Sequence, residues 1–233
     1  MREKTKWGNL KLFLLFAGPA ALLFTCVVIV PFVYGLVLTF TDWNGISNGA
    51  GFVAFQNYAD AFRDTAFWRS LLLTLGYVLA SVVLINLVAF FLAYLLTSGV
   101  KGQNFLRSAF FTPNLIGGIV LGFIWQFVFN NALTNLGELL GIEALTGSWL
   151  SDPTKAFWAL VVVTVWQYSG YMMIIYVAGF TSVPHDLIEA AGIDGCTAGQ
   201  TMRYVTLPLM VPSFVICLFL SIQRCFMVYL SLI

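Results

Sequence analysis

Side chains that could perform covalent chemistry are scarce in this sequence. His185 is its only histidine and lies next to Asp186, and none of its four cysteines belongs to a C-x-x-C pair. A histidine and an aspartate act in catalysis only when a pocket assembles them with a nucleophile, and a lone loop histidine is more typical of a solvated or capping residue. The H-E-x-x-H and G-x-x-x-x-G-K-[ST] patterns are absent. We therefore predict no catalytic residue, no metal site and no cofactor on this chain.

The most unusual polar stretch reads EAAGIDGCTAGQTMRYVTLP and begins at Glu189, between two long apolar segments. Asp186 stands three residues before Glu189, which is the spacing of a capping box with Asp in the capping role. Thr197 and Gln200 repeat that spacing. Gly195 separates the two and suits the positive φ at which many helices end. The stretch predicts two short helices joined at Gly195.

One interpretation of this loop is a pair of interfacial helices that only shields the ends of membrane spans. Interfacial helices usually turn Lys and Arg toward anionic headgroups. This loop instead carries Asp186, Glu189 and Asp194, and its first cation is Arg203. Because an acidic helix is repelled by an anionic leaflet, the loop is better suited to a basic groove on a cytoplasmic partner protein.

The elements around this loop belong in a membrane. The 233 residues are 60% hydrophobic and 9% charged, whereas about a quarter of a soluble domain is charged. The apolar segments of this chain are about 20 residues long and do not alternate between polar and apolar residues. Such segments indicate membrane-spanning helices rather than the strands of a barrel. We predict an all-α polytopic membrane protein with about five transmembrane helices, the first retained as a span, and the last interrupted by Arg224: Leu12–Phe40, Ser70–Leu96, Ser108–Phe129, Phe157–Phe180 and Val205–Ile233.

The distribution of Lys and Arg predicts the orientation, because cytoplasmic loops carry an excess of both. Seven cations lie on one side of the predicted topology, namely Arg2, Lys4, Lys6, Lys11, Lys101, Arg107 and Arg203. Three lie on the other side, namely Arg63, Arg69 and Lys155. The N-terminus, residues 1–11, and the loop of Glu189 are therefore expected in the cytoplasm. A net charge of +1 gives no indication of nucleic-acid binding.

Neutral polar side chains within the predicted spans are candidates for a solute path. Amides can bond hydroxyl groups and aromatic rings can stack on sugar faces, so such a lining favours a neutral or weakly charged solute. The alternative is hydrogen bonding between helices, the common use of buried amides in membranes. The first four spans lack charged residues, which argues against an ion-coupled carrier. The candidates are Asn86, Asn114, Gln126, Gln167, Tyr168 and Tyr171.

The acidic loop also resembles a family signature. The pattern E-A-A, three residues, Gly, nine residues and I-x-L-P is similar to the loop of ABC importer permeases, with Val in place of Ile, and the matching residues are Glu189, Ala190, Ala191, Gly195, Val205, Leu207 and Pro208. The stretches QNYADAFRDTAFWRSLLLTL, FLRSAFFTPNLIGG and WLSDPTKAFWALVVVTVWQ resemble the carbohydrate branch of the maltose and glycerol-phosphate type. The resemblance covers nearly the whole chain to about Ser221.

This resemblance implies a mechanism and a set of partners. The loop at 184–204 would be a coupling helix that docks on a cytoplasmic ATPase dimer, which would hold ATP and Mg. A second permease subunit and an extracytoplasmic solute-binding protein would complete the importer in a bacterial-type plasma (inner) membrane, surrounded by lipid. The solute would be a sugar or a related polyol or glycerol-phosphate-like molecule. The implied coupling residues are Asp186, Glu189, Ala190, Ala191, Asp194, Gly195 and Pro208.

The C-terminal residues depart from this pattern. We divide the chain into residues 1–11, a permease domain at 12–221 and an atypical end at 222–233, SIQRCFMVYLSLI being the final stretch from Ser221. The family usually continues with a Gly-rich loop and one more span, so we expect that span to be missing. Two alternatives stay open: an ATP-independent facilitator or secondary carrier, and a non-functional truncated remnant.

Overall fold

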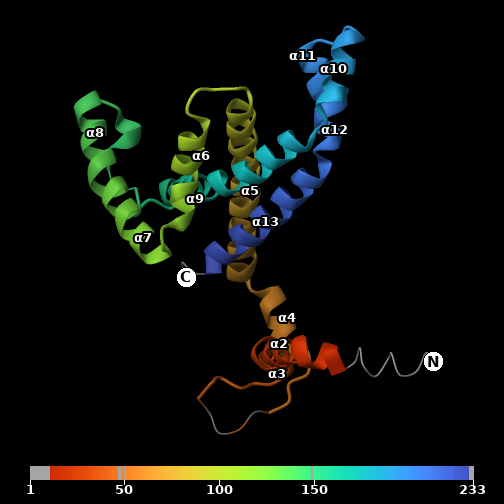
Figure 1. Ribbon diagram of the computed structural model, residues 1–233. Coiled ribbons are helices and arrows are strands. Elements are labelled where there is room, and N and C mark those ends of the chain that lie inside the picture. The colour runs from red at the N-terminus through yellow and green to blue at the C-terminus, as the bar shows by residue number, and fades with distance from the viewer. Residues whose placement is uncertain (1–10, 47–48, 50, 148, 231–233) are drawn as a thin grey trace, which may run out of the picture. The chain divides into compact units, whose positions relative to one another are not determined.

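The computed structural model describes residues 11–46, 49, 51–147 and 149–230, with side chains left undescribed at 144 and 228–230. These residues form helices, with one isolated antiparallel bridge between Thr41 and Phe52 (Figure 1). The chain is divided into two compact units, the first ending at Leu71 and the second beginning at Leu72. The predicted all-α class is therefore confirmed.

The first unit contains one apolar span with a local change of helix type. After helical residues 11–16, the span consists of α2 (Gly18–Phe24), the π-helix η1 (Thr25–Ile29) and α3 (Val30–Leu38). Pro19 and Pro31 lie in the first turns of α2 and α3, where a missing N–H removes no helical hydrogen bond. None of the span is buried within its own unit. The predicted cations Arg2, Lys4 and Lys6 lie outside the described residues.

The short helix α4 (Gln56–Arg63) is anchored to the end of α3. The Asn57 Nδ2 atom donates to the carbonyl oxygens of Thr39 at 2.9 Å and Thr41 at 2.8 Å. The Tyr58 hydroxyl lies 2.7 Å from the Thr39 hydroxyl. Phe40, Phe55 and Tyr58 pack their rings together. These contacts fix the start of α4 against the end of the first span.

The second unit is organised around α9 (Pro153–Ser182), which packs against α13 (Val211–Leu230), α6 (Gln103–Phe111) and the side chains of α5 (Thr65–Thr97). Buried residues of α5 recur every three or four positions from Tyr77 to Leu96, so a single face of this helix enters the core. The Tyr77 hydroxyl lies 2.8 Å from the Thr164 hydroxyl, which joins α5 to α9 inside that core.

Asp152 caps the start of α9. Its carboxylate accepts from the backbone N–H groups of Thr154 at 2.8 Å and Lys155 at 3.0 Å. These two bonds hold the pKa of Asp152 below its ordinary value. The contribution of the cap to stability is fully present at pH values above the ordinary pKa of an aspartate. It is lost as the pH falls through the lowered pKa of Asp152 in the folded chain.

We expect this cap to be visible in amide hydrogen exchange. Asp152→Ala should speed exchange in the first turn of α9 at neutral pH, because two N–H groups lose their acceptor. Asp152→Asn should keep the amides of this turn protected at neutral pH, and this protection should no longer be lost at acidic pH. Equal exchange in the native chain and Asp152→Ala, after correction for intrinsic rates, would show that the cap contributes nothing.

The third predicted span, Ser108–Phe129, is wrong in its bounds. The helix α6 ends at Phe111, the 3-10 helix η2 covers Thr112–Leu115, and Ile116 and Gly117 are extended. Pro113 and the paired glycines explain this break, because proline lacks a donor and glycine weakens a helix. The helix of spanning length is instead the continuous run of α7 (Gly118–Phe127), the π-helix η3 (Val128–Ala132) and α8 (Leu133–Leu140).

The last predicted span, Val205–Ile233, is bent rather than straight. The helices α11 (Ala198–Thr201), η5 (Met202–Thr206) and α12 (Leu207–Leu209) meet α13 at an angle of 67°. Pro208 and Pro212 flank the bend at Met210. The described residues contain four helices of spanning length, or five if the bent pair counts as one. Residues 231–233 lie outside the described part.

Candidate coupling loop and solute path

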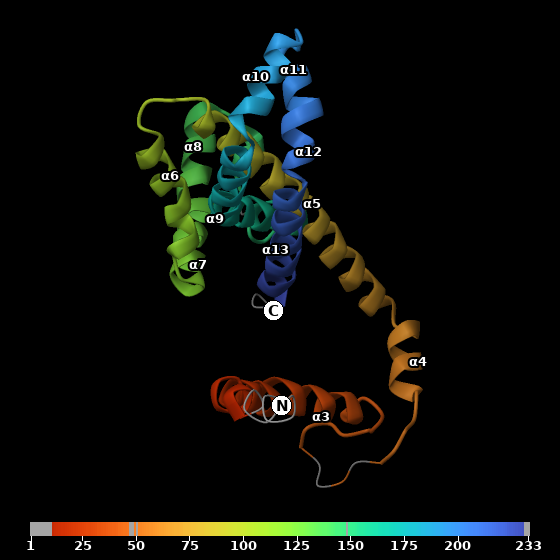
Figure 2. The same ribbon diagram turned by 45° about the vertical axis from the view of Figure 1, so that its right-hand side comes forward.

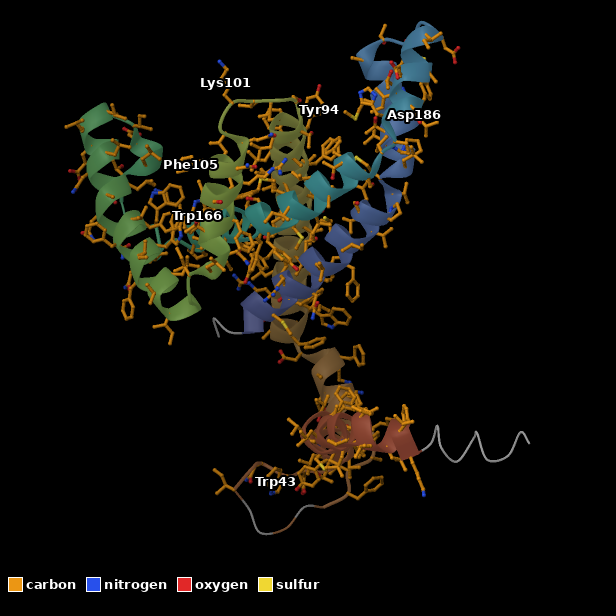
Figure 3. The ribbon with its side chains drawn as sticks, in the orientation of Figure 1. Trp43, Tyr94, Lys101, Phe105, Trp166 and Asp186 are labelled. Carbon is orange, nitrogen blue, oxygen red and sulfur yellow. The ribbon has the colours of Figure 1, made fainter. Side chains whose placement is uncertain are left out.

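The acidic loop forms a helical hairpin at one end of the second unit. The helix α10 (His185–Ile193) follows α9 and leads to α11, and both short helices extend beyond α9 and α12 (Figures 1 and 2). Lys101, in the connection between α5 and α6, lies at the same end as Asp186 (Figure 3). The two loops that were predicted to share one side of the membrane therefore lie at the same end of the second unit.

The break between the two helices follows the prediction. Gly195 has φ +81°, the left-handed conformation that a helix C-terminus requires of the residue after it. The Cys196 N–H donates to the Ala191 carbonyl at 2.9 Å and the Gly195 N–H donates to the Gly192 carbonyl at 3.1 Å. This pair of bonds satisfies carbonyls at the end of α10 and fixes the angle of the turn.

One of the two predicted capping boxes is wrong. The helix α10 begins at His185 and follows Pro184, and no side chain caps it. Asp186 is therefore inside the first turn, too late to act as the cap, although its charge still suits the positive end of the helix dipole. The second box is confirmed: the Thr197 N–H donates to Gln200 Oε1 at 2.8 Å, and the Gln200 N–H donates to Thr197 Oγ1 at 3.4 Å.

We predict that Thr197→Ala loosens the second half of this loop. Loss of a Thr cap costs about 1 kcal/mol, and α11 is too short to form without it. Limited proteolysis should cleave between Gly195 and Thr201 faster in this variant. Thr197→Ser, which retains the hydroxyl, should behave as the native chain does, and equal cleavage of all three would exclude a capping role.

The loop presents charge and apolar surface to its surroundings. Asp186, Glu189 and Asp194 are exposed, and Ile193 is 84% exposed at the turn. Of the apolar residues Leu187, Ile188 and Ala191 on α10, Ala191 is buried, whereas Leu187 and Ile188 are exposed. Ile193 was missed by sequence reasoning. Its signal was a large apolar residue just before the Asp-Gly break, where no span begins. Pro208 lies in α12, near the bend.

Among the candidate path residues, Asn86 is occupied by protein groups. Its Nδ2 atom donates to the Val82 carbonyl at 2.8 Å and to Ser221 Oγ at 3.0 Å. Its Oδ1 atom accepts from the Tyr176 hydroxyl at 2.8 Å. These bonds connect α5, α9 and α13, so for Asn86 the geometry favours hydrogen bonding between helices over contact with a solute.

Three candidates share a stripe of α9. Gln167 and Tyr171 are four residues apart, and Tyr168 lies between them on the same side of the helix. Gln167 and Tyr171 turn toward the α6–η2 segment, where Gln167 Nε2 lies 3.5 Å from the Ile116 carbonyl and the Tyr171 ring lies 6.5 Å from the Phe111 ring. The guanidinium of Arg224, on α13, lies 5.8 Å from the centre of the Tyr168 ring.

The two remaining candidates lie on other elements. Asn114 is half-buried in η2, in the break that replaced the predicted third span. Gln126 is exposed on α7. Its neighbour Trp125 packs edge to face on Trp166 of α9, with ring centres 5.4 Å apart.

Arg224 was treated in the sequence only as an interruption of an apolar segment, because its contact with Tyr168 depends on how α9 and α13 pack.

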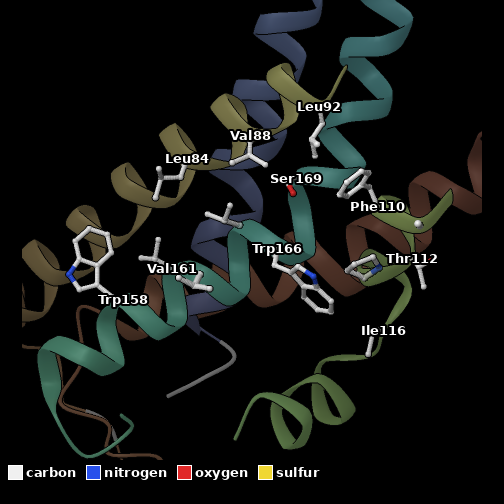
Figure 4. A pocket seen from close by; sticks show the side chains of 14 residues that line it. Leu84, Val88, Leu92, Phe110, Thr112, Ile116, Trp158, Val161, Trp166 and Ser169 are labelled. Atoms are coloured by element: carbon white, nitrogen blue, oxygen red, sulfur yellow. The ribbon is translucent and has the colours of Figure 1, made fainter. Parts of the chain in front are cut away.

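A separate groove of about 680 Å³ lies between α5, the α6–η2 segment and α9 (Figure 4). Its lining is almost entirely apolar, with Leu84, Val88, Val161, Trp158 and Trp166 among its residues. Hydroxyl-rich solutes need hydrogen-bonding partners when they leave water. We therefore do not assign the solute path to this groove.

Comparison with known families identifies the chain. Residues 85–231 match the family described as the binding-protein-dependent transport system inner membrane component. The chain belongs to this family. The match includes α9, the acidic loop and α13, and it continues past Ser221, where the resemblance found in the sequence had ended. The protein is thus a multi-pass membrane permease of the ABC importer type.

Relatives of this permease are similar over most of its length. It is 42% identical over 215 residues to a probable starch degradation products transport system permease protein of Thermoanaerobacterium thermosulfurigenes, covering 92% of this chain and 73% of that protein. It is 31% identical to a diacetylchitobiose uptake system permease protein of Streptomyces coelicolor, covering 89% and 62%. A crystal structure of a bacterial ABC transporter that imports alginate has the same fold, with a TM-score of 0.77 at 20% identity, covering 95% and 76%.

Proposed function

We propose that this permease carries a sugar, or a related polyol or glycerol-phosphate-like molecule, across the membrane when a separate ATPase closes on its acidic loop. The observation that carries the proposal is the hairpin of α10 and α11, which follows the E-A-A-x3-G pattern and extends from the second unit with its carboxylates exposed. The names of the relatives, which include starch products and diacetylchitobiose, support a carbohydrate. The chain itself performs no covalent step, and ATP and Mg belong to the ATPase.

The coupling role follows from the shape and charge of the hairpin. Exposed Asp186, Glu189 and Asp194 can pair with arginines on the ATPase. Exposed Ala190 allows a close approach, and the capped turn at Gly195 makes the hairpin rigid enough to transmit a push. Continuity of α9 with α10 through Val183 gives that push a direct route into the core of the second unit.

We assign the solute path to the polar stripe of α9. One N–H of the Gln167 amide bonds to the Ile116 carbonyl, and its oxygen can accept from sugar hydroxyls. Tyr168 and Tyr171 supply rings for sugar faces. We also propose that the N-terminus and the hairpin are cytoplasmic, because the predicted topology places the larger number of Lys and Arg on their side. For the hairpin, the position of Lys101 at the same end of the second unit supports this orientation (Figure 3). The permease domain is assigned to residues 12–221, with the coupling loop at 184–204.

The test is uptake into proteoliposomes that contain this permease, its sister permease and the ATPase, with the solute-binding protein outside. We expect accumulation of a labelled maltodextrin or chitobiose against its gradient when ATP is inside. Equilibration without ATP would instead identify a facilitator. Absence of any uptake, with all subunits present in the complex, would match the remnant alternative.

A further inference from the structure

The apolar groove between α5, the α6–η2 segment and α9 runs toward the connection that holds Lys101. In Figure 4, Trp158 lies at one end of the groove, and Leu92 and Phe110 lie together at the other. Leu92 precedes the end of α5 by five residues, and Leu84, farther along the groove, precedes it by thirteen, or about 20 Å along the helix. The hydrocarbon core of a bilayer is about 30 Å thick. Measured along α5, the groove therefore extends from near the hairpin end through roughly one leaflet.

The side chains that line this groove suit a lipid chain better than another helix. Most of them are large and apolar, as Val88 and Trp166 are, and of the lining residues only Ala109, Thr112 and Ser169 are small or carry a hydroxyl. Close helix pairs in membranes rely on small residues and on polar groups that bond across the contact. A flexible acyl chain needs only apolar surface, which this groove provides.

Two cations lie beyond the end of the groove that is nearest the hairpin. Lys101 lies two residues before the start of α6, and Arg107 lies three residues, or one turn, before Phe110. The Arg107 Nε atom is buried and has no hydrogen-bond partner among the described residues. Neither α5, α6 nor α9 contains an Asp or a Glu, and Figure 3 shows Tyr94 between Lys101 and Asp186 of the hairpin. The two cations are therefore left without a carboxylate on the helices that form the groove.

The start of α6 has the features of a membrane interface. Phe105 is 77% exposed, and an exposed aromatic ring beside cations is typical of a segment that lies in the headgroup layer. No side chain caps α6, so the backbone N–H groups of its first turn can donate to an anion. The charge, the free backbone donors and the interfacial position all favour an anionic headgroup at this place.

We propose that an anionic phospholipid binds here, with its phosphate at the start of α6 and one acyl chain in the groove. Lys101 and Arg107 attract the headgroup, since each Lys or Arg near a membrane surface strengthens the binding of anionic lipid. The groove holds the acyl chain between α5, the α6–η2 segment and α9. The site involves neither the carboxylates of the hairpin nor the polar stripe of α9, so it is independent of the proposed function.

The test is photo-crosslinking in phosphatidylcholine vesicles that contain this permease with its sister permease and the ATPase. A trace of phosphatidylglycerol or of phosphatidylcholine is added, each with the same diazirine-bearing acyl chain, and labelled peptides of this chain are identified by mass spectrometry. We expect phosphatidylglycerol to label the groove segments of α5, α6 and α9 more strongly than phosphatidylcholine does. Lys101→Gln and Arg107→Gln should each lower the phosphatidylglycerol labelling by about 5-fold and leave the phosphatidylcholine labelling unchanged.

Matched variants separate the headgroup from the chain. Arg203→Gln removes an exposed cation from η5, which does not line the groove, and should change neither labelling. Val88→Trp fills the groove and should reduce its labelling by both lipids. Val120→Trp places the same side chain on an exposed face of α7 outside the groove and should have no effect there.

Three results would overturn the inference. Equal labelling of the native groove by the two lipids would mean that bulk lipid fills it without regard to charge. Absence of label from the groove would mean that a protein segment, such as a helix of the sister permease, covers it. A preference for phosphatidylglycerol that survives removal of both Lys101 and Arg107 would place the headgroup elsewhere. ATP-driven uptake is measured separately, so none of these results decides the proposed function.

Discussion

Glu189→Lys is expected to abolish sugar-stimulated ATP hydrolysis by the reconstituted importer while the chain still inserts into the membrane. Glu189 is exposed on α10 and makes no helix-capping contact with Asp186, so its replacement leaves the fold of the chain unaffected. At an interface with a basic groove, a reversed charge replaces an attraction by a repulsion. Such a change costs about 3 kcal/mol or more of the free energy of docking. This corresponds to a ~100-fold weaker association of the ATPase with the loop.

Controls distinguish this effect from a general effect of charge. Glu138→Lys makes the same replacement at an exposed position of α8, far along the chain from the hairpin, and should leave ATP hydrolysis at the native rate. Glu189→Gln should hydrolyse ATP at a rate between those of the native chain and Glu189→Lys, because it loses the attraction but adds no repulsion. Native ATP-driven uptake by Glu189→Lys would show that α10 is not the coupling helix.

Gly170→Ala is expected to prevent the second unit from packing. A Cβ atom at Gly170 would overlap the carbonyl oxygen of Phe110 on α6. The obstacle is backbone rather than a flexible side chain, so the helices must move apart to accept it. Overpacking usually costs 1–3 kcal/mol, and we expect about 3 kcal/mol here, with a strong fall in the amount of monodisperse protein after detergent extraction.

Gly76→Ala provides the matched control. Gly76 lies in α5, and, apart from its chain neighbours and the backbone of its own helix, no atom of the described residues comes within 4 Å of a Cβ placed there. Since alanine is the better helix former by about 1 kcal/mol, this variant should be as stable as the native chain or more so. A thermal melting temperature of Gly170→Ala equal to that of Gly76→Ala would contradict the close crossing of α6 and α9.

Local patterns predicted the hairpin better than the spans. Thr197, Gln200 and Gly195 act within one turn of the chain, so their spacing alone determines the cap and the break. Asp186 failed as a cap because the cap position is Pro184, two residues earlier, and a shift of that size removes the capping geometry. The same chemistry thus gave one confirmed and one wrong prediction.

Hydropathy identified the apolar segments without showing where a helix breaks. The stretch through Pro113 and Gly117 contains no charge and looks continuous, yet the backbone is extended at Ile116 and Gly117. The use of Asn86 was also open in the sequence, because amides in a membrane bond to helices or to solutes. Only the packing of α5, α9 and α13 brings Tyr176 and Ser221 to it.

The measurement that tests the central claim most directly is co-purification of the ATPase with this chain. The permease is expressed with its sister subunit and the ATPase, extracted in mild detergent and captured by a tag on this chain, in native form and as Glu189→Lys. The account predicts that the native chain retains both partners and that Glu189→Lys retains the sister permease but loses the ATPase. Equal retention of the ATPase by both forms would contradict the assignment of α10 as the docking element.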